Sequence, residues 1–248
     1  MRKISVFLLI IIVLLQMPVS ANGYNVPVLM YHMVEKEEMG LAPGVSVTPE
    51  RLREHLSALK ESGYTTITFT DYYNYITTGK RFPNKSVLIT FDDGYTNNYT
   101  YLFPILKELD MKATIFVVAS SVGQTPGEYP HFGWEQAREM EESGLVDIQS
   151  HTYSHQDLTS LTPEEVRYEL RMSRYLIEKN LNKKCHYLAY PFGFYNDAVL
   201  KISQEAGYIL TTQVSNHIAV TYYGNFEPIK RITVDGDWTV HQLFQKIK

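Results

Sequence analysis

Apolar, β-branched runs alternate with helical patterns along most of the chain, and this alternation restricts the folds that the sequence can adopt. Short connections join the runs to the helical patterns, which is typical of parallel strands with helices outside. Seven or eight repeats favour a closed or partly closed barrel over an open sheet. We therefore predict an α/β fold, a closed or partly closed (β/α) barrel of seven to eight strands. The strand-like runs cover residues 26–31, 65–69, 87–91, 113–118, 146–149, 187–190, 209–214 and 229–234.

Capping residues define several of the helices. Thr48, followed by Pro49, predicts a helix start, and Gly63 predicts its end. A Thr-Pro-Glu-Glu sequence at 162–165 is a capping box. Asp237 is predicted to cap the last helix.

The first 21 residues have the pattern of a secretory signal. Arg2 and Lys3 precede an apolar run at 4–15. Small residues at 19–21 then suit cleavage, and the apolar run is short for a membrane-spanning helix. We predict a signal peptide at 1–21 and a secreted or cell-surface protein; an uncleaved membrane anchor is the alternative.

Length and charge limit what the remaining residues, 22–248, can be. They suit one domain, because α/β barrels of this length form a single unit. The net charge of the whole chain is −4, so the composition gives no indication of a basic nucleic-acid surface, and no nucleic-acid partner is predicted. The chain has one cysteine, Cys185, so no internal disulfide can form. No specific protein partner is indicated.

Several of the predicted strands end at side chains that can do chemistry. Asp92 and Asp93 follow one strand, His151 follows another with His155 four residues later, and His32 follows the first. The carboxyl ends of barrel strands form one rim, so these side chains should meet there. Two His and one Asp can hold a metal with one position open for water. The remaining carboxylate is then free to accept a proton.

Each motif alone is weak, because Asp-Asp-Gly is usually a turn and paired histidines are often surface residues. Their combination at strand ends carries the argument. Residues 90–94 (TFDDG) and 151–155 (HTYSH) closely resemble the polysaccharide deacetylases, the NodB-homology domain of carbohydrate esterase family 4. The resemblance extends from about Val26 to the end of the chain. It implies a deformed barrel of the polysaccharide deacetylase type and metal-dependent removal of acetyl groups from N-acetylglucosamine polymers or, more rarely, from acetylated xylan.

The resemblance also implies roles for individual residues. Asp93, His151 and His155 match the metal ligands, and Asp92 matches the general base. Phe192 falls where the backbone N–H helps to hold an oxyanion, a role that needs only the amide. Zn²⁺ suits this ligand set, and Co²⁺, Ni²⁺ or Mn²⁺ could also occupy it.

The chain departs from the family pattern at two places. Ala189 stands where the family has an arginine that orients the base, and Arg231 on a later strand is a candidate replacement. The usual Leu-x-His near the C-terminus is missing, and His241 is predicted to be a surface residue. Residues 28–32 form a hydrophobic strand that ends in His32, and this segment resembles the opening of a circularly permuted branch of the family that includes deacetylases of poly-β-1,6-N-acetylglucosamine. We therefore predict that His32 is the general acid; a satisfied core histidine is the alternative.

Substrate contacts are predicted for Tyr190, Pro191 and Trp134. Trp238 could also stack on a sugar ring, and for both tryptophans a core position is the alternative. The leading hypothesis is a secreted metal-dependent N-deacetylase acting on an exopolysaccharide, peptidoglycan or a chitin-like polymer. An O-acetyl esterase acting on acetylated xylan, or a catalytically weak carbohydrate-binding protein, are the alternatives.

Overall fold

The computed structural model describes residues 23–36, 44–215, 217–221 and 224–247. The predicted signal peptide at 1–21 therefore lies outside the described residues. Among the helices that are described, none combines the length and the apolar character needed to cross a membrane.

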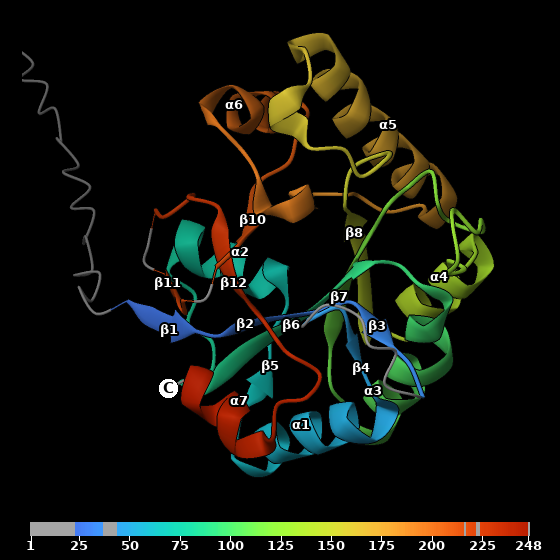
Figure 1. The fold of residues 1–248 in the computed structure, drawn as a ribbon. Coiled ribbons are helices and arrows are strands. Elements are labelled where there is room, and N and C mark those ends of the chain that lie inside the picture. Colours follow the sequence, from blue (N-terminus) through green and yellow to red (C-terminus); the bar gives the residue numbers. More distant parts are fainter. Residues whose placement is uncertain (1–22, 37–43, 216, 222–223, 248) are drawn as a thin grey trace, which may run out of the picture.

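Parallel strands in the described part of the chain close a seven-strand barrel, and one further strand extends it (Figure 1). The ring closes because β2 pairs with both β12 and β6, and β5 (Thr65–Thr66) pairs with the first two residues of β6. The predicted deformed (β/α) barrel is confirmed. Around the ring the strands are β2 (Val28–Tyr31), β12 (Ile229–Thr233), β10 (Leu210–Val214), β9 (Tyr187–Ala189), β8 (Val146–Ser150), β7 (Ala113–Val117) and β6 (Ser86–Asp93).

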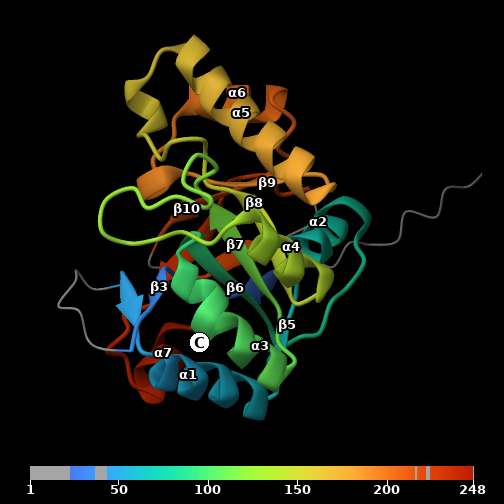
Figure 2. The same ribbon diagram turned by 90° about the vertical axis from the view of Figure 1, so that its right-hand side faces the viewer.

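Helices surround this barrel, and Figure 2 shows α5 and α6 packed side by side along one flank. The helices are α1 (Pro49–Glu61), α2 (Phe69–Thr78), α3 (Phe103–Leu109), α4 (Trp134–Glu142), α5 (Pro163–Leu181), α6 (Asp197–Glu205) and α7 (Val240–Lys246). Shorter turns are the π-helical η1 (Asn98–Leu102) and the 3₁₀ segments η2 (Leu158–Ser160) and η3 (Pro191–Gly193). Two small pairs complete the fold: antiparallel β1 (Tyr24–Val26) with β11 (Ala219–Thr221), and parallel β3 (Met33–Val34) with β4 (Ser46–Val47).

Two of the predicted local features differ from the structure. Only the first two residues of the predicted strand at 65–69 are extended, because Thr68 and Asp71 form a capping box that starts α2 at Phe69. The last helix is capped by Thr239 and not by Asp237, since the Thr239 hydroxyl accepts the N–H of Gln242. In both places a capping box fixes the boundary.

Apolar side chains fill the barrel and the layer between the barrel and its helices. The start of α2 contributes to the core inside the barrel, because the ring centroid of Phe69 lies 5.6 Å from that of Phe116 and 5.4 Å from that of Tyr187. One histidine is buried among these apolar groups. His55 on α1 donates from Nε2 to the Trp238 carbonyl at 2.7 Å, and its Nδ1 lies 3.3 Å from the Tyr31 hydroxyl.

This buried histidine makes stability depend on pH. Burial lowers the pKa of His55, and Arg51 adds to the shift whereas the hydrogen bond to Trp238 and the charge of Glu54 oppose it. His55 therefore binds a proton more readily in the unfolded chain than in the folded protein. The contribution of neutral His55 to the free energy of unfolding is complete above the unfolded pKa of about 6.5 and is lost as the pH falls below that value. We expect the urea midpoint to fall between pH 7 and pH 5, and less steeply in His55→Gln.

Burial also lowers the pKa of buried His151 and of partly buried His131, so the variant should reduce the slope without abolishing it. The control is His241→Gln, which changes an exposed histidine on α7. An unchanged slope in His55→Gln would contradict the assignment.

Candidate active site

Asp93, at the end of β6, meets two histidines that follow β8. Its Oδ1 lies 3.7 Å from His151 Nε2 and 3.6 Å from His155 Nε2. One donor atom from each residue can be chosen so that all three lie within 4.8 Å of one another. The three predicted metal ligands therefore converge at one point of the rim.

The two-histidine, one-aspartate donor set suits a divalent metal with an open coordination position. His151 donates from Nδ1 to the Ala189 carbonyl at 2.8 Å, so its Nε2 lone pair faces Asp93. Burial lowers the pKa of His151 to about 4, although the Asp92 carboxylate opposes the shift. The ring is therefore neutral at pH 7, the form that binds a metal. His155 is partly exposed, which leaves one side of the group open to solvent.

The backbone is left-handed at two of the three ligands and at the residue that follows the third. Asp93 has φ 71°, His155 has φ 61°, and Thr152 between the histidines has φ 68°. The left-handed region costs a side-chain-bearing residue roughly 1–2 kcal/mol. The Thr152 hydroxyl oxygen accepts the His155 N–H at 3.0 Å and so stabilises this turn.

Asp92 is buried beside the metal ligands and is paired with Arg231 of β12. The guanidinium donates two hydrogen bonds to the carboxylate, at 2.6 Å and 2.7 Å, and one to the Thr90 hydroxyl at 3.3 Å. Burial disfavours the ionised carboxylate, but the charge of Arg231, and at low pH that of protonated His151, outweighs burial and holds the pKa of Asp92 well below its usual range. Asp92 is thus an ionised carboxylate fixed in orientation. The structure therefore places Arg231 on the carboxylate that the missing motif arginine would orient.

His32 follows β2, which lies between β12 and β6 in the ring. The register pairs Tyr31 with Phe91, which brings His32 level with Asp92. Nδ1 of His32 donates to the Gly44 carbonyl at 2.9 Å, and this bond fixes the tautomer with Nε2 unprotonated in the neutral ring. The buried Asn98 side chain donates to the His32 carbonyl at 2.8 Å.

Phe192 lies on the same rim, in the turn after β9. Its backbone is left-handed, with φ 59°. Phe192 is 55% exposed. Its ring centroid lies 4.9 Å from that of His155 and 5.9 Å from that of the equally exposed Phe194. Among the turn and loop hydrogen bonds of the described residues, none uses the Phe192 N–H. This amide is therefore available to a ligand at the rim.

The side chains predicted to contact substrate lie elsewhere. Tyr190 is fully buried, stacks on Tyr195 at 5.3 Å and donates to the Ser203 hydroxyl, so the prediction of a substrate contact is wrong for this side chain. Pro191 is buried as well, and the same correction applies. Both belong to the packing beneath the rim. Trp134, at the start of α4, is partly buried against the core, and so is Trp238 near α7. Both tryptophans therefore occupy the core positions predicted as the alternative to sugar stacking.

Sequence reasoning missed Glu169, which lies under the loop that carries the two histidines. Its carboxylate accepts hydrogen bonds from Tyr153 and Ser154. The signal was present, because Glu169 falls on the same helical face as Val166 and Leu170 and is buried with them. A charged residue at a core position of an amphipathic helix indicates a specific partner.

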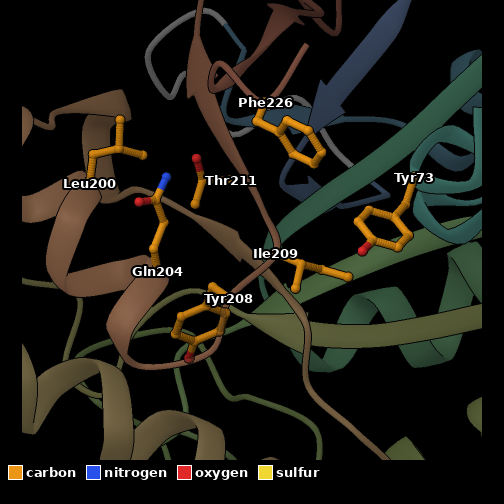
Figure 3. A pocket seen from close by; sticks show the side chains of 7 residues that line it. All are labelled: Tyr73, Leu200, Gln204, Tyr208, Ile209, Thr211 and Phe226. Atoms are coloured by element: carbon orange, nitrogen blue, oxygen red, sulfur yellow. The ribbon is translucent and has the colours of Figure 1, made fainter. Parts of the chain in front are cut away.

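A separate hollow lies between α2, α6 and β10 (Figure 3). Tyr73, Ile209 and Phe226 are among the residues that line it, and none of the described lining residues is a His, Cys, Asp or Glu. None of the predicted site residues belongs to it either. The hollow therefore offers no group for the metal chemistry of the rim.

Comparison with known proteins gives a consistent result. The family model for polysaccharide deacetylase matches residues 79–210. A putative polysaccharide deacetylase of Bacillus subtilis, YxkH, is 36% identical over 184 residues, which are 74% of this chain and 62% of the relative. The poly-β-1,6-N-acetyl-D-glucosamine N-deacetylase of Staphylococcus epidermidis is 31% identical over 234 residues, 84% of this chain and 78% of that protein.

A solved structure agrees with both relatives. The Streptococcus pyogenes deacetylase PplD, in complex with acetate, superposes with a TM-score of 0.83 at 27% identity and covers 92% of this chain and 100% of its own. The chain thus spans less than two thirds of the Bacillus subtilis relative but matches the whole of a solved deacetylase. The family model, the relatives and the fold point to one conclusion: this chain belongs to the polysaccharide deacetylase family.

Proposed function

We propose that the protein is a metal-dependent N-deacetylase that removes acetyl groups from a polymer containing N-acetylglucosamine. The observation that carries the proposal is the meeting of Asp93, His151 and His155 with the Arg231-held carboxylate of Asp92 at one rim. The similarity to a poly-β-1,6-N-acetyl-D-glucosamine N-deacetylase supports an N-acetylated exopolysaccharide as the substrate. The signal-like pattern at 1–21 supports action at the cell surface.

Asp93, His151 and His155 would hold the metal, with Zn²⁺ our first choice. When bound, such a metal lowers the pKa of water and polarises a carbonyl. Asp92, ionised and held by Arg231, accepts the proton of the attacking water. The Phe192 N–H donates to the oxyanion that forms at the acetyl carbonyl.

His32 then protonates the departing nitrogen. It follows β2, which lies across the ring of strands from β8, the strand that precedes the His155 loop. Its Nδ1–H bond to Gly44 leaves Nε2 as the nitrogen that carries the transferable proton. The products are acetate and a free amine on the sugar. Protonation matters because an amine anion is a very poor leaving group.

Replacing His32 tests this step and separates an amide substrate from an ester. We expect His32→Ala to slow acetate release from N-acetylglucosamine oligomers by about a hundredfold, because general acid catalysis typically contributes 10²–10⁴-fold. Hydrolysis of an activated aryl acetate, whose leaving group needs no proton, should change much less. His241→Ala is the matched control on exposed α7. Equal losses on both substrates would contradict the assignment of His32 as the acid.

The proposal as a whole is tested by acetate release from β-1,6- and β-1,4-linked N-acetylglucosamine oligomers, using zinc-loaded protein before and after chelation. Release that disappears on chelation and returns with Zn²⁺ would support it and would show which linkage is preferred. No release from either oligomer, with release from acetylated xylan, would favour the O-acetyl esterase. Binding of polymer without any release would favour the carbohydrate-binding protein.

A further inference from the structure

The loop that carries His151 and His155 is held from two opposite sides. On one side, the carbonyl oxygens of Thr152 and Tyr153 accept the N–H groups of Ala119 and Ser120, which follow β7, at 3.1 Å and 2.9 Å. The N–H groups of Tyr153 and Ser154 instead donate toward α5. The loop is therefore fixed by backbone groups on one side and by a helix on the other.

Glu169 is the group on α5 that receives these donors. Its Oε2 accepts the N–H of Tyr153 at 3.1 Å and that of Ser154 at 2.8 Å, and its Oε1 accepts the Ser154 hydroxyl at 2.5 Å. The residue is 3% exposed. Three donors and no acceptor around the carboxyl oxygens suit the ionised form, which only accepts. Among the described residues, no Lys, Arg or His forms a salt bridge with Glu169.

A second polar pair continues the same arrangement one helical turn further along α5. The Ser173 hydroxyl lies 2.7 Å from the Ser150 hydroxyl, which accepts the N–H of Thr152 at 3.2 Å. Three successive N–H groups, at Thr152, Tyr153 and Ser154, are thus satisfied by side chains on or linked to one face of α5. The rest of that face is apolar, with Val166, Leu170 and Ile177.

A buried carboxylate without a cation is costly, and an apolar residue at this position would serve the helix better. The neighbouring backbone supplies the reason for its presence. Thr152 and His155 are held in the left-handed region, and such residues persist only where the surroundings over-determine them. The contacts of Glu169 fall between these two positions, at Tyr153 and Ser154.

We propose that Glu169 is a positioning residue that holds the loop in the conformation in which His151 and His155 point at Asp93. This inference rests on the metal site of the proposed function. Glu169 is not one of the three candidate ligands, and its hydrogen bonds go to Tyr153 and Ser154, so it acts through the loop.

Calorimetric titration of the metal-free full chain with Zn²⁺ tests this inference without any substrate. We expect Glu169→Ala to weaken zinc binding about 10–100-fold, the usual effect of removing a group that orients metal ligands. Glu169→Gln can keep the contacts, because its oxygen can accept both N–H groups while its amide donates to the Ser154 hydroxyl oxygen. We therefore expect Glu169→Gln to bind zinc several times more tightly than the alanine variant.

Glu165→Ala is the matched control. Glu165 belongs to the same helix and also accepts hydrogen bonds, but its partner is the exposed cap residue Thr162. This control should lower the melting temperature without changing zinc affinity. Zinc affinity within twofold of wild type in folded Glu169→Ala would overturn the inference. If that variant does not fold, Glu169→Met is tested instead, because it fills the same space without a hydrogen-bond acceptor, and wild-type zinc affinity in Glu169→Met would overturn the inference in the same way.

Amide hydrogen exchange at Tyr153 and Ser154 gives the second readout. Faster exchange at these two amides in Glu169→Ala, with the helix otherwise protected, is the expected result. This readout needs neither zinc nor polymer. If the wild-type protein binds no metal, the proposed function is wrong, and amide exchange alone then decides whether Glu169 holds the loop. Unaltered exchange at both amides in folded Glu169→Ala would overturn that role.

Discussion

Replacing Asp92 with Asn should reduce acetate release from an N-acetylglucosamine oligomer about a thousandfold, because a positioned general base contributes 10²–10⁴-fold. An amide cannot accept the proton that the attacking water loses. The effect should appear in kcat more than in KM, since the carboxylate acts on water and not on the sugar. Zinc affinity should stay close to that of wild type, because Asp93, His151 and His155 are unchanged.

The measurement is initial-rate kinetics of zinc-loaded protein, with calorimetric zinc titration of the same preparation. Asp197→Asn is the control, because Asp197 is an exposed carboxylate in the first turn of α6 and lies outside the rim. Near-normal turnover in Asp92→Asn would show that another group is the base. Loss of zinc binding together with activity would show that Asp92 supports the metal ligands.

The positions of the candidate ligands were predictable because sequence and topology point the same way. Asp93 is the last residue of one buried strand and His151 comes directly after another, and the ends of parallel strands form one rim. His155 then follows by spacing alone. The structure confirms that these three side chains meet, and it also confirms that β2 and β12 are neighbours, as the placement of His32 required.

Side-chain direction at the ends of strands could not be predicted as well. Tyr190 lies between β9 and η3, where the alternation of a strand no longer applies, and its ring turns inward to Tyr195. Glu169 was missed for a different reason. Two of its three hydrogen bonds come from backbone N–H groups, which leave no trace in the sequence, so only its place on an apolar helical face distinguished it.

Arg231 is an intermediate case, because the sequence suggested it as a replacement for the motif arginine but could not place it. Its contact with Asp92 joins positions 139 residues apart. It exists only because the barrel closes with β2 between β12 and β6, an arrangement set by many strand pairs together. Long-range closure of this kind is a property of the whole fold, not of a local pattern.

Removing one charge of the buried Arg231–Asp92 pair should cause a large loss of folding stability. Both side chains are almost fully buried, so removing one leaves an unpaired charge in the interior. We expect Arg231→Met to lower the free energy of unfolding by about 3–5 kcal/mol at pH 7. The Phe116 ring, 5.4 Å from the guanidinium, and the Thr90 hydroxyl also lose a partner. Arg53→Met is the control, since the Arg53–Glu108 pair is exposed and should contribute less than about 1 kcal/mol.

The double variant Arg231→Met with Asp92→Asn decides why the pair is there. If the unpaired charge causes the loss, removing both charges should restore most of the stability, and a double-mutant cycle in urea should give a coupling of about 2 kcal/mol or more. Additive losses would show that packing around each side chain matters instead. A stable but inactive double variant would mean that the buried pair is dispensable for folding. The ion pair would then be retained because it keeps one carboxylate ionised and correctly oriented beside the metal ligands.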